Sequence, residues 1–138
     1  MEQPVELPEG SWWDWDVFSW CPGELRLAAG YDLTYYHGLE LVFADPLYVR
    51  CPAFFQDPAF RTPTPEDRLL VERQCGEPPG VLVAFEADGG GVEPVTGLIA
   101  AGSVEVRSGP VLRRGHGTEP AERPRGTESG GRTVPPPG

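Results

Sequence analysis

One histidine of this chain stands among carboxylates and tyrosines, in residues 32–40. His37 follows Tyr36 directly, and it is close in sequence to both Asp32 and Glu40. A histidine beside a carboxylate can exchange protons or supply part of a metal site. Zinc needs three or four protein ligands, and the only other histidine is His116. We therefore predict that Asp32, Tyr36, His37 and Glu40 contact a partner, and a hydrolase that uses His37 with Asp32 or Glu40 is an alternative.

A second candidate site is the aromatic segment at residues 11–20, which reads SWWDWDVFSW. Aromatic rings beside carboxylates can bind cationic side chains or stack on sugars. Clustered tryptophans also supply core area in small domains, so both interpretations stay open. An extended segment would place Trp13, Trp15 and Val17 on one face and Trp12, Asp14, Asp16, Phe18 and Trp20 on the other. From this segment we assign partner contacts to Trp12, Asp14, Trp15 and Asp16.

Other signatures of chemistry are missing from the sequence. The three cysteines, Cys21, Cys51 and Cys75, are odd in number and widely spaced, which fits neither a disulfide framework nor a zinc site of paired CxxC motifs. The glycines that follow Asp88 lack the Lys and Ser of a phosphate-binding loop, and they predict a flexible turn instead. We expect no catalytic residue, no metal and no cofactor.

The net charge is the most informative functional property. The 138 residues carry 11 Arg and 21 acidic residues, a net charge of −10, and residues 1–112 alone carry six Arg against 18 acids. Such a field repels nucleic acid and anionic membranes and attracts basic proteins. In composition alone, the chain resembles the small acidic immunity and antitoxin proteins of bacteria, which occupy basic nuclease surfaces.

Composition also bears on source and compartment. All 11 basic residues are Arg and no Lys or Asn occurs, which is typical of a GC-rich bacterial genome. The N-terminus is acidic where a secretory signal would be cationic, and no apolar run approaches the roughly 18 residues of a membrane span. We expect a cytoplasmic protein with reduced thiols.

The chain divides near residue 112. Residues 115–138 include eleven Gly or Pro residues and almost no apolar side chains, which is typical of disorder. We predict a single acidic domain at residues 1–112 and a disordered tail at residues 113–138.

Short strands dominate the rest of the pattern. Residues 39–51 alternate about Ala44-Asp45-Pro46 and predict a β-hairpin with its turn there. Further strands are expected at residues 24–27, 81–87, 95–101 and 103–107. In the last of these, Val104 and Val106 would face inward.

One helix is expected at residues 65–74, because Thr64 can cap it, Pro65 suits its first turn and Gly76 can end it. The proline-rich residues 51–65 predict an irregular crossover held by Phe54, Phe55 and Phe60. The fold class is therefore mostly β, an antiparallel sandwich or open barrel-like roll with one short helix, and α+β is the alternative.

These observations favour a non-enzymatic protein-binding domain that contacts a basic partner. The first alternative is a β-domain that binds a small ligand or a carbohydrate through the Trp cluster. The second is the hydrolase described above.

Overall fold

The computed structural model describes residues 5–30, 33 and 36–112, which form six strands and one helix. In chain order these are β1 (Asp14–Cys21), β2 (Glu24–Gly30), β3 (Tyr36–Arg50), β4 (Phe54–Arg61), α1 (Pro65–Cys75), β5 (Val81–Asp88) and β6 (Val95–Leu112). The domain boundary and the tail predicted at residues 113–138 lie outside the described residues. No helix in the described part of the chain is long and apolar enough to cross a bilayer.

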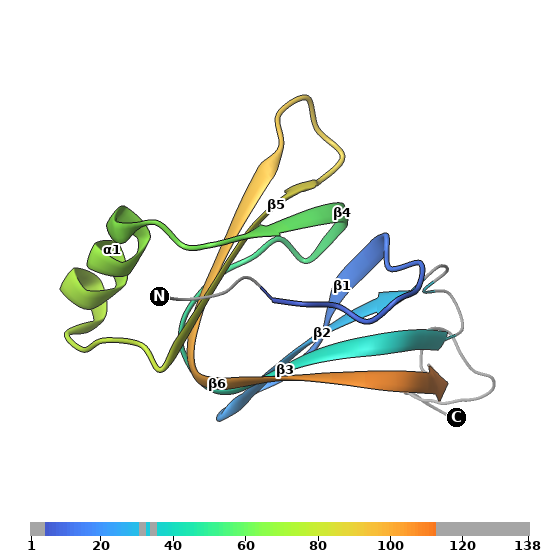
Figure 1. The fold of residues 1–138 in the computed structure, drawn as a ribbon, viewed down its shortest axis with the longest axis horizontal. Coiled ribbons are helices and arrows are strands. Elements are labelled where there is room, and N and C mark those ends of the chain that lie inside the picture. The colour runs from blue at the N-terminus through green and yellow to red at the C-terminus, as the bar shows by residue number, and fades with distance from the viewer. Residues whose placement is uncertain (1–4, 31–32, 34–35, 113–138) are drawn as a thin grey trace, which may run out of the picture.

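The strands form a closed barrel in the order β1-β2-β3-β6-β5-β4, and β4 returns to pair with β1. Every pairing is antiparallel, and α1 lies outside the barrel (Figure 1). The mostly-β prediction is thus confirmed, with a closed barrel as the architecture. Closure involves only part of β6: β5 pairs with it through residues 95–101, and residues 103–112 are paired with β3 alone among the described strands.

The hairpin predicted at residues 39–51 is wrong. These residues belong to one strand, β3, which pairs with β6 along its whole length. Asp45 adopts a positive φ of 54°, and its N–H donates to the carbonyl of Gly23 at 2.8 Å. The register shifts between Pro46 and Tyr48, so the residues that suggested a turn form a bulge that bends a continuing strand.

The irregular crossover predicted at residues 51–65 is also wrong, because most of it forms β4. This strand pairs with β1 through residues 54–56 and with β5 through residues 56–61. Its register shifts between Gln56 and Ala59, and that bulge contains Asp57 at φ 51° and Pro58. A bulge accommodates proline because the ladder needs no N–H there.

The barrel interior holds the main core. Trp15 stacks on Phe55, and Phe55 stacks on Phe85, with ring centroids 5.8 and 4.8 Å apart. Alternate residues of the neighbouring strands complete it, and the aliphatic members are Leu25, Leu27, Leu39, Leu41, Val83 and Ile99. Gly97 faces the Phe85 ring so closely that a Cβ there would overlap it. The structure therefore places Trp15 in the core.

A second, smaller core lies between α1 and the outside of the barrel. Val71 of the helix packs over Leu82 and Ala84 of β5 and over Leu98 and Ala100 of β6. The predicted helix signals are confirmed: Thr64 and Asp67 form a capping box, and Gly76 ends the helix in the left-handed region. In the chain α1 lies between β4 and β5, and it sits at one end of these two strands, far from β1 (Figure 1).

Candidate functional site

The outer surface of the neighbouring strands β1, β4 and β5 carries carboxylates, and those of β5 lie beyond Leu82 and Ala84, which α1 covers. Trp15 and Phe55 face inward, so the residues beside them in β1 and β4 face outward. In β5 the inward residues are Phe85 and Ala87, which turns Glu86 and Asp88 outward. We call this surface the acidic face, and we define it by Asp14, Asp16, Phe54, Glu86 and Asp88.

Cross-strand pairing fixes how the acidic face is arranged. Asp14 pairs with Gln56, and Gln56 pairs in turn with Asp88. Residues that pair directly across strands share a face, so these three form a row across β1, β4 and β5. The amide Nε2 of Gln56 donates to Oδ1 of Asp14 at 3.2 Å. This bond holds one carboxylate of the row in place on the barrel wall.

Phe54 supplies an apolar group within the acidic face. It pairs with Asp16 across β4 and β1, and 63% of its surface is exposed. Large apolar side chains with this exposure are typical of contact surfaces when they stand among polar groups.

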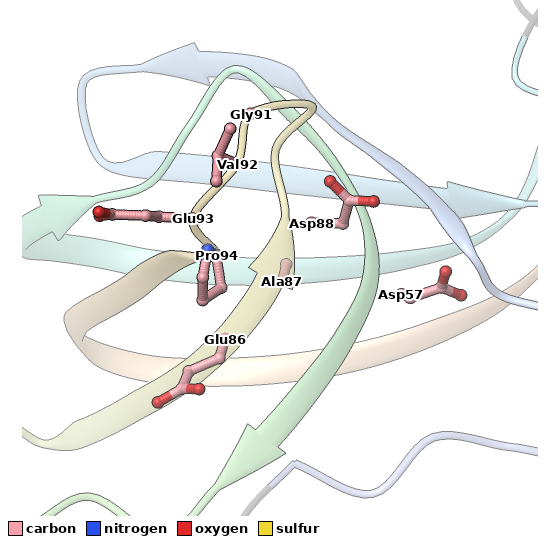
Figure 2. Close-up of a pocket in the computed structure, with 8 residues that line it drawn as sticks. All are labelled: Asp57, Glu86, Ala87, Asp88, Gly91, Val92, Glu93 and Pro94. Carbon is pink, nitrogen blue, oxygen red and sulfur yellow. The ribbon is translucent and has the colours of Figure 1, made fainter.

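An open cleft of about 390 Å³ continues the acidic face at the β5–β6 turn. Asp57 of the β4 bulge lies on one side, and Glu86, Asp88 and Glu93 come from the hairpin (Figure 2). In Figure 2 Asp57 and Asp88 point to one side of the hairpin and Glu93 to the other, so the carboxylates spread out and do not converge on one point. Val92, at the tip of the turn, is fully exposed.

No Arg among the described residues pairs with a carboxylate of this cleft. Within the described residues, ion pairs join Arg26 to Glu24 and Glu40, Arg61 to Asp67, and Arg107 to Glu105. Asp57, Glu86, Asp88 and Glu93 take part in none of them. Their charges are therefore not compensated by an Arg of the described chain.

The structure also brings His37 and Glu40 together, as the sequence suggested. Nε2 of His37 lies 2.7 Å from Oε2 of Glu40, and Nη1 of Arg26 donates to Oε1 of the same carboxylate at 2.9 Å. Arg26 also donates through Nε to Glu24 at 2.9 Å. The result is a chain of four side chains on the outer surface of β2 and β3.

His37 and Glu40 share a face only because β3 is irregular between them. Residues three apart lie on opposite faces of a regular strand. The register against β6 shifts between His37 and Leu39, which turns His37 out of the barrel. The ring of Phe18 from β1 then packs edge-on against the imidazole, with centroids 4.6 Å apart.

The environment of His37 differs from that of an open catalytic site. Its side chain has no exposed surface, and Nδ1 is buried without a hydrogen-bond partner. Within the described residues no group of three or more His, Cys, Asp or Glu is placed to hold a metal ion. A substrate could reach the imidazole only after neighbouring groups had moved.

The remaining predicted contacts fall in different places. Trp15 is fully buried in the core, and its indole N–H donates to the carbonyl of Trp12 at 2.7 Å, so it offers no surface to a partner. Trp12 is half-buried and lines a separate groove. Asp32 lies outside the described residues, as does the side chain of Tyr36.

The acidic face contains residues that are not among the predicted partner contacts. Phe54 was expected to hold a crossover, and the row of Asp14, Gln56 and Asp88 depends on pairing between strands far apart in sequence. The alternation of Glu86 and Asp88 about Ala87 is the signal that could have found two of its carboxylates.

Comparisons of the chain with protein-family models, with curated proteins and with solved structures find no match.

Proposed function

We propose that this chain is a protein-binding domain whose acidic face contacts a basic partner. The observation that carries the proposal is the distribution of charge over three adjacent strands. Residues 14–17, 54–59 and 86–88 include five carboxylates, Asp14, Asp16, Asp57, Glu86 and Asp88, and no basic residue. A surface of one sign raises the rate at which partners of the opposite sign associate, and salt weakens the effect.

Phe54 favours arginine over lysine in that partner. A guanidinium group is planar, so it can stack on an exposed aromatic ring while it bonds to a carboxylate through two N–H groups. Asp16 stands directly across from Phe54 on the neighbouring strand, which puts a carboxylate beside the ring. Oδ1 of Asp16 is buried, so an arginine stacked on Phe54 would bond to Asp16 through its other oxygen. Lysine carries a compact, strongly hydrated charge and gains less from the ring.

The two other functions considered from the sequence have less support. A sugar-binding surface needs several free tryptophan faces side by side. Trp15 is in the core and the indole N–H of Trp12 already donates to Pro8, which leaves Trp13 and Trp20 as the exposed tryptophans. A hydrolase needs an accessible base, and His37 is fully buried.

A titration followed by NMR tests the proposal. The probe is an Arg-Gly repeat peptide, compared with a Lys-Gly peptide of equal length and charge. We expect the Arg peptide to shift backbone amide signals of β1, β4 and β5, to bind more tightly than the Lys peptide, and to lose affinity as salt rises. Equal shifts over the whole barrel would overturn the proposal.

Two variants of equal charge provide the control. The face variant carries Asp14→Asn, Asp16→Asn, Glu86→Gln and Asp88→Asn, and the control variant carries Glu6→Gln, Asp45→Asn, Glu72→Gln and Glu77→Gln. Both lose the same number of negative charges, so a response to net charge alone weakens them equally. The proposal requires that the face variant lose most of its affinity while the control variant keeps it.

A further inference from the structure

The second half of β6 is an open edge of the sheet. Residues 95–101 pair with β3 on one side and with β5 on the other, whereas residues 103–112 pair with β3 alone among the described strands. In Figure 1 this half is the orange arrow, which lies at the margin of the sheet beside β3. Alternate residues of an antiparallel strand direct their N–H and C=O groups to opposite sides. Every second residue of 103–108 therefore directs these groups away from β3, where no described strand bonds to them.

The open edge also leaves an apolar side chain of the inner face uncovered. Val106 pairs directly with Leu41, which is fully buried, yet 39% of the surface of Val106 is exposed. Ile99, on the closed half of β6, pairs with Val49 on one side and Val83 on the other, and it has no exposed surface. Ile99 thus has a strand on both sides and Val106 has one on a single side. A strand added beside Val106 would cover it as β5 covers Ile99.

The charges of this edge are complementary to a second copy of the same edge. Residues 104–108 read Val-Glu-Val-Arg-Ser, and Glu105 and Arg107 are exposed and form an ion pair at 3.1 Å. If two copies pair antiparallel about a twofold axis at Val106, each Glu105 stands opposite Arg107 of the other copy, and the two Val106 side chains meet. An axis at residue 105 or 107 would instead bring two Glu or two Arg face to face. The charges therefore select one register.

The stretch that can pair ends at Gly109 and Pro110. Gly109 has a φ of 132°, which departs from strand geometry, and Pro110 has no N–H to offer to a neighbouring strand. An open strand edge is a template for another strand, and main-chain hydrogen bonds then supply the affinity. We propose that two copies of this chain associate through residues 103–108 of β6, which continue the sheet from one copy into the other.

Sedimentation of the full chain over a range of concentrations tests the inference, in salt that screens the net charge of −10 on each copy. We expect the wild type to associate reversibly to twice the mass of one chain. Glu105→Arg and Arg107→Glu each place like charges opposite one another, so each variant alone should associate about tenfold more weakly. An equimolar mixture of the two variants should regain the affinity, because opposite charges then face each other again. The double variant, which keeps the net charge of the wild type, should regain it alone.

A wild type that stays a monomer at every concentration would overturn the inference, and the edge would then be left to a different chain or to another segment of this one. Stronger association of Glu105→Arg would also overturn it, because that variant carries less negative charge and net charge alone would then govern association. Association that neither single variant weakens would place the contact elsewhere on the molecule. None of these results bears on the acidic face, whose residues lie on β1, β4 and β5.

Discussion

Nε2 of His37 lies 2.7 Å from Oε2 of Glu40, and both side chains are buried on the outside of the barrel wall. The carboxylate also accepts from Arg26 through its second oxygen. Glu40 thus satisfies two neighbours at once in a place that water hardly reaches.

Replacement of Glu40 should therefore destabilise the fold. Glu40→Leu leaves Nε2 of His37 buried without a partner, and it removes one acceptor from Arg26. We expect the free energy of unfolding to fall by about 1–3 kcal/mol in urea titrations. Glu105→Gln, which alters the exposed pair with Arg107 and a weaker attraction to Arg26, is the control and should change stability much less. Equal losses in both variants would contradict the account of Glu40.

Gly97 tests the packing of the barrel interior. A methyl group there meets the ring of Phe85, which is fully buried and stacked on Phe55, so the ring cannot move aside freely. We expect Gly97→Ala to lower the free energy of unfolding by about 1–3 kcal/mol. Gly91→Ala, in open space on the β5–β6 turn, is the matched control and should have little effect. A stable Gly97→Ala variant would mean that the interior is looser than described.

Asp67 makes stability depend on pH. Burial alone would raise the pKa of this carboxyl, but hydrogen bonds from Thr64 and the ion pair with Arg61 outweigh burial, and the pKa is lowered. A lowered pKa in the folded state stabilises the protein above the unfolded pKa of about 3.9, and this contribution disappears as the pH falls through the folded value. At neutral pH the free energy of unfolding of the wild type should exceed that of Asp67→Asn by about 0.5–1 kcal/mol. Thermal unfolding at a series of pH values should show this difference in stability disappearing in acid. A difference that stayed constant with pH would contradict this.

The three cysteines should differ in reactivity. Burial raises the pKa of the Cys51 thiol to about 12, whereas Cys21 is exposed. Because the thiolate is the reactive form, iodoacetamide should modify Cys21 in the native protein and reach Cys51 only after unfolding. Mass spectrometry of digested samples gives the order of modification. Rapid alkylation of Cys51 in the folded protein would show that the connection between β3 and β4 opens easily.

Local sequence signals predicted α1 well and β3 poorly, for a physical reason. The start of α1 depends on contacts between Thr64 and Asp67, which are three residues apart. The turn residues of β3 also indicated a local structure, a hairpin turn at Ala44-Asp45-Pro46. There, however, β6 runs beside both halves of the strand and bonds to them, so distant pairing converts a turn into a bulge at Asp45. The alternation of inward and outward side chains on either side of Asp45 is compatible both with a hairpin and with one continuous strand that contains a bulge.

For the candidate site too, local contacts were predictable from the sequence and contacts that depend on strand pairing were not. The proximity of His37 and Glu40 could be proposed from sequence, but their shared face depends on the register shift beside Gly38, which follows from pairing with β6. Trp15 and Asp16 were grouped because they are adjacent, and strand alternation then sent one into the core and the other outward. Phe54 joined the face through pairing with Asp16, which is distant in the chain, and no local pattern encodes such a pairing.

Capture from a lysate of the source cell tests the central claim most directly. The wild type, the face variant and the control variant of equal charge are each used as bait, at low and at high salt, and the recovered proteins are identified by mass spectrometry. We predict that the wild type and the control variant recover the same Arg-rich basic protein at low salt, that high salt releases it, and that the face variant does not retain it. Recovery of one partner by all three baits, independent of salt, would contradict the account.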